Sequence, residues 1–161
     1  MIKYVLSVLI LILTLRLSES YIAKRERSLN LVFELCDFVA YLDKKMRVSR
    51  APTHVLARGF KGALLSELGF IDAITPDRGV REAFLELDLK DNIDEKSYEI
   101  LDGLFSQIGS AGADYERERI SACYNVLSEQ KKLQADNFQK EKRIIRTLSF
   151  SFALGIIILL L

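Results

Sequence analysis

Few side chains in this sequence stand in patterns that perform acid–base or metal chemistry. The single histidine, His54, has no cysteine or second histidine at the spacing of metal ligands. Glu82, Glu86 and Asp88 resemble a carboxylate pair, but acidic residues at helical spacing usually form a solvated helix face. No serine stands in a nucleophile elbow. We therefore expect no catalytic centre and no enzyme activity.

An acidic segment near the middle of the chain is the main candidate for cation binding. Its carboxylates are Asp88, Asp91, Asp94 and Glu95. An EF-hand loop starting at Asp88 would need an oxygen ligand at its third position and glycine at its sixth, where the chain has Lys90 and Ile93. We therefore predict a solvated connector with a helix cap and no bound metal.

Neither the glycines nor the cysteines form a cofactor site. Residues 59–62 contain a lysine but lack the GxxxxGK[ST] order of a phosphate-binding loop, and residues 109–112 contain no lysine. Cys36 and Cys123 belong to no CxxC or histidine-paired arrangement. We interpret them as small core residues on helices, with a bridge or a reactive thiol as the alternative. No cofactor is predicted.

The composition points to a membrane rather than to nucleic acid. Half of the 161 residues are hydrophobic although 28% are charged, so the apolar residues must be concentrated, and they gather at the two ends. The net charge of +1 argues against nucleic-acid binding, which needs a clustered basic excess.

The N-terminal apolar run, Tyr4 to Leu15, is ambiguous between a signal peptide and a short anchor. Its roughly 12 residues span only about 18 Å as a helix. A cleavage-like Ser18-Glu19-Ser20 follows, but Arg16 stands where a signal peptide is normally neutral. Snorkelling of Lys3 and Arg16 would extend the run. We therefore predict an uncleaved anchor over residues 1–17.

The C-terminal run is clearer, because Thr147 to Leu161 carries no charge and Ile144 and Ile145 precede it. We predict a transmembrane helix over residues 144–161. The basic residues that flank each run lie on the side of the intervening domain: Arg16, Lys24, Arg25 and Arg27 after the first, and Lys140, Lys142, Arg143 and Arg146 before the second. The positive-inside rule therefore predicts a cytoplasmic domain with both termini across the membrane.

Between the ends the hydrophobic pattern is helical throughout. A stripe with spacings of three, four and seven residues predicts a helix from near Ser18 to near Val48, which Ala51-Pro52-Thr53 interrupts. Thr75-Pro76-Asp77 has the form of an N-cap with a first-turn proline and predicts the start of another helix.

The second half of this domain is predicted as two more helices. Tyr98 to Ile108 forms one apolar face, and Gly109 stands where a left-handed C-cap belongs. Gly109 to Gly112 predicts a tight connection, after which Asp114 caps the last helix. The predicted fold is all-α: a helical bundle over residues 18–143 between two terminal transmembrane helices.

The order of these signals resembles the stage III sporulation protein AB family of endospore-forming bacteria. Its members have an anchor, a long helix, a Thr-Pro-Leu break, a Leu/Phe-Gly-x-x-Leu-Gly turn followed by Asp, and a charged helix leading into a Leu- and Gly-rich end. The matching residues are 51–53 for the break, 104–109 for the turn, Asp114 and 148–161. The chain departs from this pattern at Ala51, Thr53, Phe105 and Ser149, and Asp114 comes about two residues late.

The resemblance implies a non-enzymatic scaffold in the secretion-like channel complex that links mother cell and forespore. It implies a location on the mother-cell side of the outer forespore membrane, and the family is in turn similar to the inner-membrane platform proteins of type II secretion and type IV pilus machines. The implied partners are a cytoplasmic secretion-type ATPase, other membrane proteins of the complex and the lipid bilayer, and a homo-oligomer is compatible. A generic membrane-anchored adaptor and a secreted helical binding module cleaved after Ser20 are the alternatives.

Partner contacts are expected in the polar connectors that would lie far from the membrane. The candidates are Asp88, Asp91, Asp94, Glu95, Gly109, Gly112 and Asp114. The alternative is that these residues only connect helices.

Overall fold

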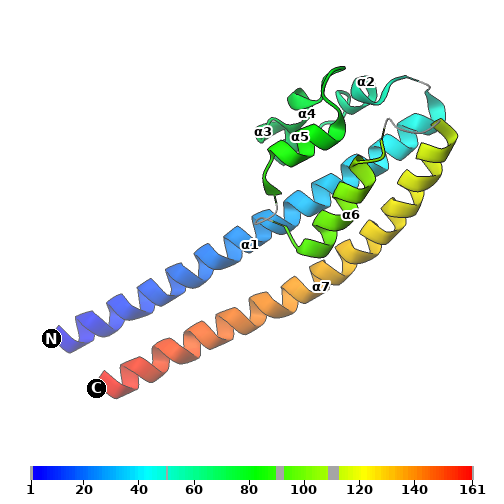
Figure 1. Cartoon of the computed structure of the whole chain (residues 1–161). Coiled ribbons are helices and arrows are strands. Elements are labelled where there is room, and N and C mark those ends of the chain that lie inside the picture. The colour runs from blue at the N-terminus through cyan, green and yellow to red at the C-terminus, as the bar shows by residue number, and fades with distance from the viewer. Residues whose placement is uncertain (1, 50, 90–92, 109–112, 161) are drawn as a thin grey trace. The chain divides into compact units, whose positions relative to one another are not determined.

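The computed structural model describes residues 2–49, 51–89, 93–108 and 113–160, with side chains for 6–49, 51–89, 93–108 and 118–158. Its helices are α1 (Ile2–Val48), α2 (Thr53–Ala57), α3 (Ala63–Glu67), α4 (Phe70–Ala73), α5 (Val80–Glu86), α6 (Glu95–Phe105) and α7 (Ala113–Leu160) (Figure 1). The described residues contain no strand, which confirms the predicted all-α class.

The chain divides into two compact units. We call Ser28–Lys132 the central unit, and Met1–Arg27 together with Leu133–Leu161 the paired-helix unit. Both long helices contribute to both units, so the predicted domain boundaries at residues 17 and 143 fall inside α1 and α7. Those boundaries mark the ends of apolar runs and stay predictions.

Helix α1 is unbroken up to Val48, where the sequence predicted its end. Residues 2–50 contain neither glycine nor proline. Near the end, Arg47 pairs with Asp43 at 3.0 Å, and cations in the last turn suit the negative end of the helix. Pro52 then stands as the N-cap of α2.

The core of the central unit forms around α1. Its side chains Leu35, Phe38 and Leu42 are fully buried. The centroid of the Phe38 ring lies 5.2 Å from the ring centroid of Phe70 on α4 and 6.3 Å from that of Phe105 on α6. These edge-on aromatic contacts join three helices that are short or distant in sequence. The short helices therefore depend on packing against α1, since isolated helices of this length are not stable in water.

A carboxylate of α1 also fixes the start of α3. Glu34 accepts the backbone N–H groups of Leu64 at 2.8 Å and Leu65 at 3.1 Å. These are donors that the first turn of a helix leaves without an intrahelical partner. Glu34 thus replaces a local capping residue, which explains why the sequence around Gly62 gave no capping signal.

The predicted helix start at Thr75-Pro76-Asp77 is wrong by about one turn. Thr75 Oγ1 accepts the N–H of Arg78 at 3.1 Å, and the Thr75 N–H donates to the Arg78 carbonyl at 3.0 Å. These bonds close a tight turn before the helix. Helix α5 begins at Val80, after Gly79, whose N–H donates to Glu82 Oε2 at 2.7 Å. The capping pattern was real, but it stabilises a turn instead of a helix.

Candidate membrane anchor and partner surfaces

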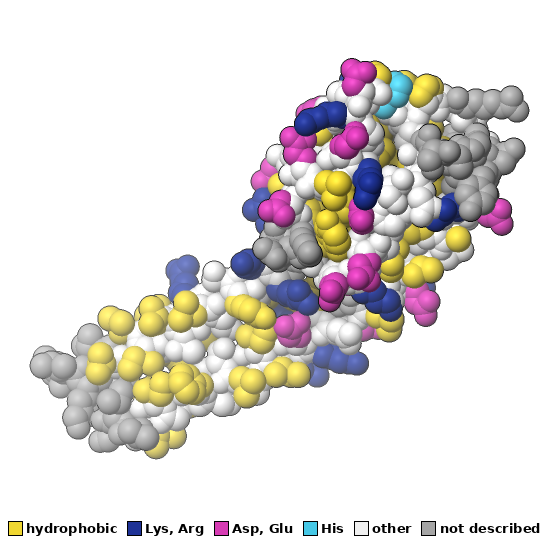
Figure 2. Space-filling view, in the orientation of Figure 1, with side chains coloured by type: hydrophobic (Ala, Val, Ile, Leu, Met, Phe, Trp, Pro, Cys, Tyr) yellow, Lys and Arg dark blue, Asp and Glu magenta, His cyan; other side chains and the backbone are white. Residues whose placement is uncertain are grey.

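The paired-helix unit exposes large apolar side chains on both of its helical segments. They are Leu6, Val8, Leu9, Ile12, Leu13, Leu15 and Leu17 on α1, and Ile144, Leu148, Phe150, Phe152, Leu154 and Ile158 on α7. Figure 2 shows hydrophobic side chains gathered over the ends of these segments. Helices in water turn such side chains inward. An apolar surface this extended is typical of contact with lipid or with another protein.

The two segments of this unit run antiparallel, side by side (Figure 1). Small side chains are buried in the unit: Ser7 and Ser18 are each 8% exposed and Ala153 is fully buried. Small residues let helices approach closely, as in membrane helix pairs. The hydroxyl of Thr14 donates to the Ile10 carbonyl at 2.8 Å, and that of Thr147 donates to the Arg143 carbonyl at 3.0 Å. Such bonds within one helix suit a medium without water.

Two ion pairs join the segments where charged residues replace the apolar ones. Arg25 lies 3.9 Å from Glu141, and Lys142 lies 3.6 Å from Glu26. Their side chains are between 24% and 49% exposed, so each pair contributes at most about 1 kcal/mol. The ion pairs are informative mainly through their position, because they lie where the surface of the paired helices changes from apolar to charged.

One helix in the described part of the chain is long and apolar enough to cross a membrane, and it lies in α1. The predicted second span over residues 144–161 does not reach that standard there. The N-terminal anchor is thus supported by composition and length, whereas the second span stays a prediction.

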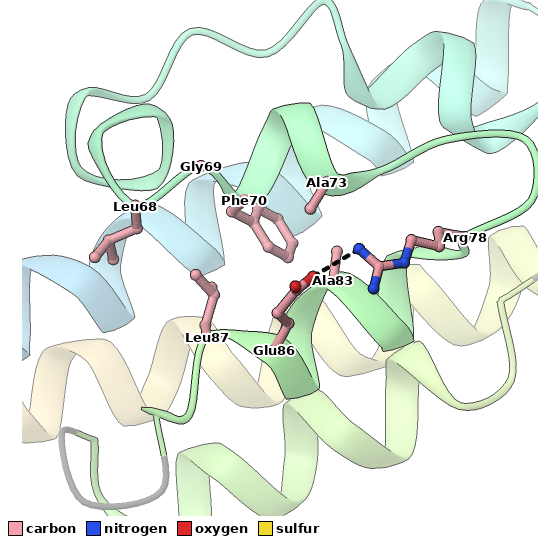
Figure 3. A pocket seen from close by; sticks show the side chains of 8 residues that line it. All are labelled: Leu68, Gly69, Phe70, Ala73, Arg78, Ala83, Glu86 and Leu87. Carbon is pink, nitrogen blue, oxygen red and sulfur yellow. Dashed lines mark hydrogen bonds and ion pairs between the residues drawn. The ribbon is translucent and has the colours of Figure 1, made fainter.

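A shallow hollow lies between α4 and α5 in the central unit, with a volume of about 340 Å³. Leu68, Gly69, Phe70, Ala73, Arg78, Ala83, Glu86 and Leu87 line it (Figure 3). Arg78 Nη1 donates to Glu86 Oε2 at 3.0 Å along one side. The hollow offers apolar contact and one ion pair but no nucleophile, so its chemistry suits docking rather than reaction. Sequence reasoning missed this pair, which the turn before α5 brings together.

The structure gives different roles to the predicted contact residues of the acidic segment. Asp94 is the N-cap of α6, with its carboxylate accepting the Ser97 N–H at 2.9 Å. This confirms the predicted helix cap. Asp88 is exposed and has a left-handed backbone, with φ of 44°. Glu95 is exposed in the first turn of α6. Asp91 lies outside the described residues.

Of the three predicted contact residues around the second connector, the structure describes Asp114. Gly109 and Gly112 lie outside the described residues, and so does the predicted C-cap at Gly109. The backbone of Asp114 is already helical, one residue into α7. A capping residue precedes the helical backbone, so the predicted capping position of Asp114 is wrong. The acidic residues that follow had suggested a later helix start.

Both cysteines are free and lie in the central unit. Burial raises the pKa of the Cys36 thiol from 9.0 to about 11, and burial likewise raises that of Cys123 to about 11. Both thiols are therefore protonated at neutral pH, in agreement with their interpretation as core residues on helices. Among the residues that the structure describes, no three His, Cys, Asp or Glu side chains are grouped to hold a metal ion.

These features define an all-α protein whose N-terminal helix is suited to a membrane and whose central unit is a small helical domain. The chain belongs to the Stage III sporulation protein AB family, whose model matches residues 3–161. It is therefore a protein of a sporulation family, as the order of its sequence signals indicated. No curated protein and no solved structure matches the chain significantly.

Proposed function

We propose that this chain is a non-enzymatic, membrane-anchored scaffold in the channel complex between mother cell and forespore. Its central unit would lie in the mother-cell cytoplasm and couple to a secretion-type ATPase. Family membership supports the link to sporulation. The exposed apolar surface on both segments of the paired-helix unit carries the proposal of a membrane-anchored scaffold, because it is the feature that a soluble helical domain would bury.

The second anchor and the orientation follow from that surface together with its flanking charge. The exposed residues Leu148, Phe152 and Ile158 favour a lipid-facing C-terminal segment, which would make residues 144–161 the second span. Basic residues follow the first apolar run and precede the second. Positive flanks remain in the cytoplasm, so the central unit would be cytoplasmic and both termini would lie across the membrane.

Contact with the ATPase is proposed at the acidic connector between α5 and α6. Asp88 and Glu95 are exposed there, and neither makes an ion pair with a described residue. Asp94 is committed to capping α6, so it would shape the contact rather than make it. The central unit carries 14 basic and 18 acidic residues, a net charge of −4. A basic patch on the partner would complement it.

Cysteine labelling of membrane topology tests the proposal. In a Cys36→Ala/Cys123→Ala background, single cysteines replace the exposed Lys96 and a residue next to each terminus. In growing cells made to express the chain, where the termini would face the medium, a membrane-impermeant maleimide should label Lys96→Cys only after the cells are permeabilised, and should label both terminal probes in intact cells. Labelling of Lys96→Cys in intact cells would instead favour an exported or secreted binding module.

Coupling to an ATPase has its own test in sporulating cells. Full-length chain should co-purify the secretion-type ATPase from membranes, and Asp88→Lys/Glu95→Lys should reduce both this co-purification and spore yield. The matched control is Glu99→Lys/Glu129→Lys, which reverses two exposed charges elsewhere in the central unit. Equal loss in both variants would show a general charge effect, and no co-purification by the parent chain would leave a generic membrane-anchored adaptor.

A further inference from the structure

Positive charge is concentrated in two short stretches of the paired-helix unit. Residues 16–27 and 140–146 hold eight of the chain's 23 basic residues but only three of its 22 acidic ones. Together they carry a charge of +5, and the rest of the chain carries −4. We call the basic residues of these stretches the basic flank: Arg16, Lys24, Arg25, Arg27, Lys140, Lys142, Arg143 and Arg146.

Most of the basic flank has no internal counter-charge. Residues 16–27 and 140–146 contain three carboxylates, and two of them, Glu26 and Glu141, already pair with Lys142 and Arg25. The exposed cations Arg16, Lys24, Lys140, Arg143 and Arg146 make no ion pair with any residue that the structure describes. These five positive charges on two neighbouring helical segments therefore require an external partner or remain solvated.

We propose that the basic flank binds the headgroups of anionic phospholipids in the leaflet where the apolar segments end. The inference rests on the proposed membrane anchor and adds the class of lipid that the anchor selects. Guanidinium groups bind phosphate oxygens with paired hydrogen bonds, and basic residues beside a membrane segment are attracted to anionic lipid. Tyr21, which is 55% exposed between Arg16 and Lys24, has the amphipathic ring that gathers at this level of a membrane.

The interleaving of charge with exposed apolar side chains favours lipid over a soluble anion or an acidic protein. Arg16 adjoins Leu17, which is 65% exposed. On the other segment Arg143 and Arg146 alternate with Ile144 and Leu148, which are 56% and 63% exposed. An anionic phospholipid has an acyl chain for the apolar side chains and a charged headgroup for the cations. Inorganic phosphate could bind the cations but offers nothing to the apolar side chains.

A tryptophan reporter can measure this preference in the full chain, since the sequence contains no tryptophan. Leu17→Trp places one beside Arg16. The protein is reconstituted in phosphatidylcholine vesicles in which either phosphatidylglycerol or phosphatidylcholine carries brominated acyl chains, which quench a neighbouring tryptophan. The ratio of quenching gives the relative association of anionic and zwitterionic lipid with that surface.

The parent reporter should favour phosphatidylglycerol by roughly fivefold or more, as expected when about one unscreened cation contributes. Arg143→Gln/Arg146→Gln should bring the ratio close to one, and so should 1 M NaCl, where the screening length is about 3 Å. The control Lys61→Gln/Lys96→Gln removes two exposed lysines of the central unit and should leave the ratio unchanged.

Each of the following outcomes would overturn the inference. Equal quenching by both lipids in the parent, or an equal fall in the control, would show no lipid selection by the basic flank. Loss of the preference in sodium phosphate but not in NaCl of equal ionic strength would show a site for the free ion instead. Failure of the parent to float with either vesicle, while circular dichroism shows it helical, would remove the proposed anchor itself. Flotation without lipid preference would remove only the inference.

Discussion

Helix α1 passes through two environments. Its apolar side chains are buried in the central unit and exposed in the paired-helix unit. In the central unit Leu35, Phe38 and Leu42 are fully buried against the shorter helices. In the paired-helix unit Leu9 and Leu17 of the same helix are 57% and 65% exposed. One unbroken helix therefore serves as the core of a small domain and as a surface suited to lipid. What differs is the number of packing partners, because in the central unit α2 to α6 and the first part of α7 contribute side chains to the same core as α1.

The comparison also shows what hydrophobicity alone leaves undecided. The apolar stripe of the central unit is one-sided, with polar residues such as Lys44 off it, which predicts burial of one face. The N-terminal run is apolar all round, which is typical of a helix surrounded by lipid or enclosed in a large core. Its large apolar side chains are exposed in the paired-helix unit, which favours lipid as its surroundings.

The largest expected effect is loss of the central core at Phe38. Phe38→Ala removes a fully buried ring that contacts the rings of Phe60, Phe70 and Phe105. We expect destabilisation by about 3–5 kcal/mol, because the cavity adds to the lost burial. Thermal unfolding of the full chain in detergent, followed by circular dichroism, measures it. Leu9→Ala in the paired-helix unit should change the unfolding temperature little, and similar shifts for both would contradict the contrast.

A charge placed on the exposed apolar surface should have the opposite pattern of effects: it should impair membrane insertion in the paired-helix unit and have little effect in the central unit. Leu9→Arg should cost about 2.5–3.5 kcal/mol of membrane insertion, since an arginine near the middle of a spanning helix lies in hydrocarbon. The measurement is the fraction of chain that resists alkaline extraction from membranes. Val55→Arg, at a position 52% exposed in the central unit, is the control and should extract like the parent. Equal retention of both variants would argue against a lipid-facing N-terminal segment.

The reactivity of the buried Cys36 and the partly buried Cys123 should report how closed the core of the central unit is. With a pKa of about 11 in place of 9.0, Cys36 and Cys123 hold about a hundredfold less thiolate at pH 7 than an ordinary exposed thiol. Iodoacetamide should therefore modify them about a hundredfold more slowly than an exposed Ser66→Cys in the Cys36→Ala/Cys123→Ala background. Equal rates would show that the core opens readily.

The same thiols also set a direction for the pH dependence of stability. Their pKa is higher in the folded chain than in the unfolded chain, so folding disfavours the thiolate. The contribution of the protonated thiols to the free energy of unfolding is constant below about pH 9 and is lost as the pH rises from 9 through about 11. Cys36→Ala/Cys123→Ala should lose less stability than the parent over that interval in thermal unfolding.

Local signals in the sequence predicted the regular parts of the fold well. The end of α1 near Val48 and the presence of a helix cap in the acidic segment were each predicted from a few neighbouring residues. The structure confirms both, and Asp94 supplies the cap. The start of α5 was misplaced because Thr75 and Arg78 use the same capping chemistry to close a turn. The hollow between α4 and α5 and the cap of α3 were not predictable this way. The hollow is lined from two helices and the turn between them, and Glu34 reaches α3 from about 30 residues away, so the tertiary fold is needed to bring these residues together.

The smallest expected effect compares two glutamates on α1, one in each unit. Glu34 accepts the N–H groups that open α3, whereas Glu26 pairs with Lys142 at a solvent-exposed surface. Glu34→Ala should destabilise the chain by about 1–2 kcal/mol, because it leaves helix donors without their acceptor. That corresponds to a fall in unfolding temperature of about 2–8 °C for a chain of this size. Glu26→Ala should cost at most about 1 kcal/mol, since water replaces an exposed ion pair. Glu34→Gln, which keeps one acceptor oxygen, should recover part of the loss. If Glu26→Ala proves as costly as Glu34→Ala, the polar residues of α1 do not follow the division that its apolar residues show, and the carboxylate of Glu34 is not what fixes α3.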